Sequence, residues 1–98
     1  MDPMSFVRLN RNGAASLSRQ LADQIRASIV SGQLHPGERV PATRKLAESL
    51  GVSRTVVVNA YDQLLGEAFL EGVAGSGTRV SRELPDWLQP RMHEIVPP

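Results

Sequence analysis

A chain of 98 residues, 41% of them hydrophobic, is long enough for one small domain with its own core. The absence of cysteine excludes disulfides and thiol chemistry, and no apolar stretch is long enough to span a bilayer. The formal net charge is only +1, but residues 83–98 carry three acidic residues and one arginine, so the residues before them carry a net +3.

The N-terminal residues 1–15 show no sustained hydrophobic periodicity, and we expect them to form an arm. The segment lacks the apolar run of a signal peptide, which favours a soluble cytoplasmic protein. Asn10-Arg11-Asn12-Gly13 has the composition of a turn. Arg8 and Arg11 either form a basic arm or, as exposed arginines more often do, are simply solvated.

A first helix is predicted from Ser16, and Gly32 ends it. Asp23 and Arg26 form an ordinary i, i+3 pair on its polar face. Its buried positions are Leu17, Leu21, Ala22, Ile25 and Ile29. This helix is scaffold.

The connection of residues 33–40 contains a Pro36-Gly37 turn. We expect Leu34 to anchor it to the core and His35 to be exposed. Arg39-Val40 can form a short strand that pairs with a later hairpin.

Residues 41–70 indicate a short helix, a tight turn and a longer helix. Leu46, Ala47 and Leu50 share one face of the first helix, Gly51 ends it, and Ser53 is a good N-cap for the second. The apolar stripe predicted for the second helix is Val57, Ala60, Tyr61, Leu64, Leu65 and Ala68. This pattern predicts a helix-turn-helix with a polar N-terminal tip.

The polar tip carries residues suited to double-stranded DNA. Arg54 can bind guanine in bidentate fashion or bind a phosphate, and Ser53 and Thr55 can bond phosphate oxygens. Val58 either touches a thymine methyl or packs under the wing, and Asn59 adds polar readout. Arg44 and Lys45 are candidate phosphate contacts, because the segment 39–54 holds four cations and one anion.

Residues 69–80 read as a β-hairpin around a Gly-Ser-Gly tip, which would be the wing of a winged helix. Gly75, Ser76 and Gly77 are therefore candidate DNA-contacting residues. A glycine-rich nucleotide-binding loop would need a strand before it and a helix after it, and this order is absent. Residues 83–98 contain four prolines and are predicted to be a semi-stiff linker to a domain outside the chain.

Enzymatic chemistry is disfavoured. His35 and His93 lie in predicted loops without cysteine or paired carboxylates, so neither a metal site nor a catalytic residue is predicted. Lys45 is the only lysine and lies in the helix-turn-helix, which argues against a Schiff base to pyridoxal phosphate in this chain.

From Leu17 to Val80 the chain resembles the GntR family of bacterial transcription regulators. The resemblance is carried by QLADQIRASIVSGQLHPGERVPATRKLAESLGVSRTVV and by EAFLEGVAGSGTRV. The combination of VVVNAYDQL with the Gly-Ser-Gly-Thr wing is most similar to the MocR subfamily, which includes regulators of pyridoxine metabolism. In such proteins a linker joins the winged helix to a large domain that binds pyridoxal 5′-phosphate.

The resemblance implies DNA contacts at Arg44, Arg54 and Thr55 and at the wing around Gly75. Three departures stand out. Ala42 replaces the usual serine cap, Val56 and Val58 replace residues that are often polar, and Val73-Ala74 lacks the usual wing arginine.

We therefore expect a mainly α, winged helix-turn-helix domain at residues 16–82, with three helices and a small β-hairpin. Its expected function is sequence-specific binding of operator DNA for a transcription regulator. A winged helix that binds another protein is the alternative, for which an apolar or acidic recognition face would be typical. No cofactor is expected in this chain and no membrane contact. The isolated domain is expected to be a monomer and the full-length protein a homodimer.

Overall fold

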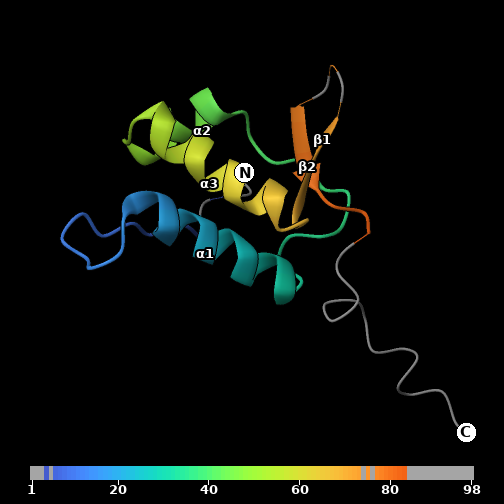
Figure 1. Ribbon diagram of the computed structural model, residues 1–98, viewed down its shortest axis with the longest axis horizontal. Coiled ribbons are helices and arrows are strands. Elements are labelled where there is room, and N and C mark those ends of the chain that lie inside the picture. The colour runs from blue at the N-terminus through green and yellow to red at the C-terminus, as the bar shows by residue number, and fades with distance from the viewer. Residues whose placement is uncertain (1–3, 5, 74, 76, 84–98) are drawn as a thin grey trace, which may run out of the picture.

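The computed structural model describes Met4, residues 6–73, Gly75 and residues 77–83. Residues 84–98 of the predicted linker, with His93, and Ser76 therefore lie outside the described residues. Three helices come first, α1 (Leu17–Val30), α2 (Thr43–Leu50) and α3 (Arg54–Gly66), and two strands follow, β1 (Leu70–Val73) and β2 (Gly77–Val80). The strands pair antiparallel with Leu70 opposite Val80, and the hairpin rises beside α3 (Figure 1). The predicted winged helix-turn-helix is confirmed.

One hydrophobic core holds these elements together. In Figure 1, α3 lies between α1 and α2, so it has an apolar neighbour on either side. Its buried residues are Val57, Ala60, Tyr61 and Leu64, which pack with Leu21, Ala22, Ile25 and Ile29 of α1, Leu46 and Ala47 of α2, and Phe69, Leu70 and Val80 of the hairpin. Leu34 is buried as predicted, with 1% of its surface exposed. The burial of the helical stripes provides most of the driving force for this fold.

The helix ends follow the local signals in the sequence. The Ser16 hydroxyl caps α1 by accepting from the Arg19 N–H, and Gly32 follows the helix with a φ of 86°. Gly51 ends α2 in the left-handed region with a φ of 69°. Only glycine adopts that conformation without strain, so the turn between α2 and α3 depends on it.

The predicted stripe of α3 is wrong at its C-terminal end. Leu65 is 37% exposed, and Ala68 is exposed with a φ of 66°. The helix ends at Gly66, and Glu67 is its C-cap. Ala68 therefore belongs to the turn into the hairpin, and its side chain no longer follows the helical period.

A short extension pairs with the hairpin as predicted. Arg39 forms a β-bridge with Arg79. The Val40 N–H donates to Thr78 O at 3.0 Å, and the Val80 N–H donates to Glu38 O at 2.8 Å. The connection between α1 and α2 is thus fixed to the wing.

The N-terminal residues contribute to the core, which the sequence did not indicate. Met4 and Val7 are 1% and 4% exposed. Two glutamines one helical turn apart hold the segment along α1. Gln24 bonds the Arg8 N–H at 2.8 Å and the Arg8 carbonyl at 2.6 Å, and Gln20 makes the same pair of bonds to Asn10. Arg11 donates to the Gly51 carbonyl and so reaches the turn of the helix-turn-helix.

Arg26 joins α1 to the end of α3. Its guanidinium lies 2.8 Å from Asp23 and 2.7 Å from Glu67, and 5.6 Å above the Phe69 ring. Burial works against its charge, but hydrogen bonds to Glu67 and Asp23 outweigh burial and raise the pKa of Arg26. The predicted pair with Asp23 is therefore one part of a larger contact between α1 and the C-cap of α3.

Candidate nucleic-acid interface

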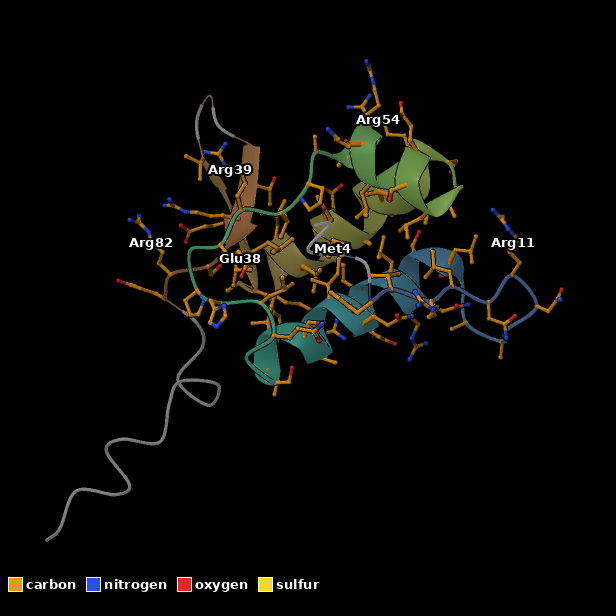
Figure 2. All side chains as sticks on the ribbon, turned by 180° about the vertical axis from the view of Figure 1, so that it is seen from behind. Met4, Arg11, Glu38, Arg39, Arg54 and Arg82 are labelled. Atoms are coloured by element: carbon orange, nitrogen blue, oxygen red, sulfur yellow. The ribbon has the colours of Figure 1, made fainter. Side chains whose placement is uncertain are left out.

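The N-terminus of α3 presents two exposed polar residues. The Ser53 hydroxyl caps the helix by accepting from the Val56 N–H at 3.3 Å, as the sequence predicts. Arg54 and Thr55 therefore occupy the first turn, and both are exposed. The Arg54 Nε donates to the Thr43 hydroxyl at 3.2 Å, and its side chain projects outward beside α2 (Figure 2).

Helix α2 adds two cations beside this turn. Arg44 and Lys45 are exposed, whereas Leu46 and Ala47 of the same helix are buried against the core. The N-cap Ala42 makes no side-chain capping bond, as expected where a serine is replaced. The first turn of α2 thus presents backbone donors, the Thr43 hydroxyl and two positively charged side chains, which suits a phosphate group.

Further along α3 the candidate residues differ in exposure. Asn59 is exposed, whereas Val58 is partly buried. One part of the Val58 surface is therefore open to solvent and the rest is covered by the protein. Tyr61 lies on the core side with 3% exposure, and its hydroxyl donates to the Pro41 carbonyl at 2.7 Å. Tyr61 is structural, as predicted.

The end of the wing contains two glycines whose backbone conformation is unfavourable for other residues. Gly75 and Gly77 have φ values of 74° and 88°, and both are exposed. A Cβ at either position would meet no atom within 4 Å, so backbone strain and not crowding restricts these positions to glycine. The hairpin tip and Arg54 lie toward the same edge of the molecule in Figure 2.

A groove of about 390 Å³ separates the start of α2 from the wing. It is lined by Arg39, Val40, Ala42, Thr43, Tyr61, Gly77 and Thr78. Arg39 belongs to the basic segment 39–54, but the sequence did not indicate it as a DNA contact. Its position across from Arg79 in a β-bridge is what brings it to the groove.

The wing also contains an ion cluster that the sequence did not indicate. The Glu71 carboxylate lies 2.6 Å from the Arg79 Nε and 3.4 Å from the Arg82 Nε. The hydrogen bond from Arg79 is the main reason that the pKa of Glu71 lies below its ordinary value, with smaller contributions from Arg82. Register could have revealed this pair, since Glu71 and Arg79 are cross-strand partners.

Metal clusters and membrane-spanning helices are two features that the described residues lack. They contain no group of three or more His, Cys, Asp or Glu side chains that could hold a metal ion. No helix among them is long and apolar enough to cross a membrane.

Comparison with known proteins identifies the family. Residues 17–80 match the family of bacterial regulatory proteins called the gntR family. The chain belongs to the GntR family. It is 46% identical over 78 residues to the probable rhizopine catabolism regulatory protein MocR of Rhizobium meliloti. It is 45% identical over 78 residues to the pyridoxine biosynthesis transcriptional regulator PdxR of Corynebacterium glutamicum. These matches cover 80% of this chain but only 16% and 17% of the two regulators.

Solved structures of the family have the same fold. YtrA of Sulfolobus acidocaldarius, a GntR-family transcription factor, superposes with a TM-score of 0.76 at 34% identity, over 82% of this chain and 84% of YtrA. The DNA-binding domain of AraR, in complex with operator ORX1, superposes with a TM-score of 0.66 at 26% identity, over 76% of this chain and 96% of that domain.

Proposed function

We propose that this GntR-family domain binds double-stranded operator DNA by sequence and is the DNA-reading part of a transcription regulator. The observation that carries the proposal is the arrangement of one surface. Arg54 at the tip of α3, helix α2 and the hairpin lie toward one edge of the molecule (Figure 2). The residues Thr55, Arg44, Lys45, Gly75 and Gly77 of these elements are exposed. The AraR domain with the same fold is bound to an operator, which supports this use of the surface.

Each residue has a chemical role in this proposal. Arg54 leads α3 into the major groove, where its guanidinium can bind O6 and N7 of guanine. Asn59, one turn further, adds amide donors and acceptors, and Val58 offers a methyl surface. Ser53 and Thr55 reach phosphate oxygens at the same helix end.

The remaining candidates would act on the DNA backbone. Arg44 and Lys45 neutralise phosphates beside the groove, and such contacts set register and affinity rather than sequence preference. The wing tip at Gly75, Ser76 and Gly77 would approach the backbone closely because glycine carries no side chain.

A protein–protein module is the competing function. A recognition face of that kind would be apolar or acidic, whereas the exposed residues at the tip of α3 and in the first turn of α2 include Arg54, Arg44 and Lys45. Glu48 is the one exposed acidic residue of α2. Positive charge at this surface favours DNA.

We further propose that the complete protein is a cytoplasmic regulator and not an enzyme. MocR and PdxR are both regulators, and both are much longer than this chain. In this proposal residues 83–98 lead to an effector domain that binds pyridoxal 5′-phosphate and forms a homodimer. The winged helix itself holds no cofactor.

Selection from a random pool of duplexes tests the proposed function. The chain should enrich one short motif, and affinity for that motif should fall steeply as salt rises. Recovery of no motif, together with equal affinity for all duplexes, would contradict sequence-specific binding.

A further inference from the structure

Three charged side chains form a row across the wing. Arg79 of β2 is the cross-strand partner of Glu71 on one side and of Arg39 on the other. Directly opposed residues project to the same face of a sheet, so Glu71, Arg79 and Arg39 are neighbours in that order. Two of the three are cations, and only one carboxylate belongs to the row.

Glu71 is already committed to two of the nearby arginines. Its Oε2 lies 2.6 Å from the Arg79 Nε and 3.4 Å from the Arg82 Nε, and its Oε1 accepts from the Arg82 backbone N–H at 3.4 Å. This carboxylate is ionised at neutral pH, and the hydrogen bond from Arg79 lowers its pKa further. Within the part of the chain that the structure describes, Arg39 makes no ion pair. Of Arg39, Arg79 and Arg82, Arg39 is therefore the one whose charge is not paired with a carboxylate among the described residues.

Arg39 is also held at a groove. Hydrogen bonds on both sides of it, from Val40 N to Thr78 O and from Val80 N to Glu38 O, fix its backbone to β2. Arg39 is exposed, and it is one of the residues at the edge of the groove of about 390 Å³ between α2 and the wing. Figure 2 shows Arg39 beside the hairpin, on the side of the connection to α2.

Two hydroxyl groups line the same groove. Thr43 and Thr78 stand on opposite sides of it, at the start of α2 and on β2. The Thr43 hydroxyl accepts from the Arg54 Nε, which leaves its own hydrogen to donate. Thr78 adjoins Arg79 along β2, so its side chain projects to the other face of the wing from that of Arg39. Arg39 is the only charged residue among those that line the groove, so it is the residue that can attract a phosphate there.

We infer that Arg39 binds one backbone phosphate of DNA at the edge of this groove, and that Glu71 keeps Arg79 and Arg82 out of the contact. This inference rests on the proposed function. The ligand is a duplex phosphate and not a free anion, because Thr43 joins the groove to Arg54 at the tip of α3. Arg39 thereby ties the wing side of the domain to the DNA backbone while α3 reads the bases.

Salt titrations of matched arginine variants test this contact. Arg39→Gln should weaken binding to the selected duplex and to a scrambled duplex by the same factor. It should lower the slope of log K against log salt by about one, so that roughly three- to fourfold less affinity is lost between about 50 and about 200 mM salt. Arg82→Gln is the control, since it removes the same charge on the other side of Glu71 and should leave the slope unchanged. Chloride and phosphate salts of equal ionic strength should compete equally.

A gain-of-function variant tests the role of Glu71. Glu71→Gln frees Arg79 beside Arg39 and should raise the slope and the affinity for both duplexes. Glu83→Gln removes one negative charge without releasing Arg79 and should have a smaller effect. Circular dichroism of each variant verifies that the helices are retained.

The outcomes separate the two proposals. Wild-type protein without salt-dependent duplex binding would defeat the proposed function itself. Normal wild-type binding with an unchanged slope in Arg39→Gln, or an equal drop in Arg82→Gln, would overturn the Arg39 contact alone. No gain in Glu71→Gln beyond that of Glu83→Gln would overturn the role of Glu71, and inhibition specific to phosphate salt would overturn the duplex contact in favour of a free-anion site.

Discussion

The Tyr61 hydroxyl donates a 2.7 Å hydrogen bond to the Pro41 carbonyl and so joins the middle of α3 to the segment that leads into α2. The two residues are 20 positions apart in the sequence. This bond ties α3 to the start of α2, where Thr43 in turn accepts from Arg54. The position of α2 relative to α3 thus depends on a buried residue of α3 that also lines the groove between α2 and the wing.

Tyr61→Phe should lower the free energy of unfolding by about 1 kcal/mol, because the Pro41 carbonyl loses a hydrogen bond in a partly buried place. Urea unfolding followed by circular dichroism measures the change. The exposed neighbour Asp62 supplies the control, since Asp62→Asn should change stability by no more than about 0.5 kcal/mol. Equal stability of Tyr61→Phe and wild type would show that this bond contributes nothing.

Valine at the wing tip should weaken DNA binding while the helices stay folded. Gly77→Val places a β-branched residue at a φ of 88°, which costs about 1–2 kcal/mol of local strain and distorts the hairpin tip. Gly72→Val is the matched control, because Gly72 lies in β1 without a positive φ, and a Cβ there would meet no atom within 4 Å. Titration with duplex DNA should show a loss for Gly77→Val only, and equal affinity of the two variants would place the tip away from the DNA.

Acid should abolish the contribution of the Glu71 cluster to stability. Because the folded-state pKa of Glu71 lies below its ordinary value of 4.5, the ionised form stabilises the fold above that pH. The contribution is lost as pH falls through the lower folded-state pKa. Unfolding of wild type and Glu71→Gln should therefore differ by a constant amount from about pH 7 to about pH 5 and converge below pH 4.5. A difference that persists unchanged at lower pH would show that the ion pair is not its source.

Joining two copies of this domain should convert weak DNA binding into strong DNA binding. A single winged helix buries only about 600–1,000 Å² on DNA, so this chain alone is expected to be a monomer that binds a half-site weakly. Two copies fused to an unrelated dimeriser should gain roughly 10²–10⁴ in affinity for a two-site duplex at the right spacing. Sedimentation of the free chain and titration of one-site and two-site duplexes measure this. A stable dimer without DNA, or no gain at any spacing, would contradict the tethered arrangement.

Much of the fold could be predicted because its signals are local. The left-handed Gly51, the Ser53 cap and the pairing of Arg39-Val40 with the hairpin each follow from a few neighbouring residues. Arg44, Lys45 and Arg54 are exposed, as their positions outside the apolar stripes predict. Their contacts with DNA stay a prediction.

The features that escaped prediction depend on partners distant in the sequence. Met4 and Val7 enter the core along a segment held by glutamine side chains, and such bonds leave no periodic pattern. Arg26 meets Glu67 across 41 residues. The groove at Arg39 arises only when the wing and α2 are placed together.

Titration of a selected duplex and its scrambled version with wild type, Arg54→Ala and Lys45→Ala tests sequence-specific binding most directly. Wild type should prefer the selected duplex. Arg54→Ala should lose roughly 1–3 kcal/mol on that duplex and much less on the scrambled one, because a base contact is removed. Lys45→Ala should weaken both duplexes alike, as expected for a phosphate contact. Equal affinity of wild type for the two duplexes, or an equal loss on both in Arg54→Ala, would contradict base reading by α3.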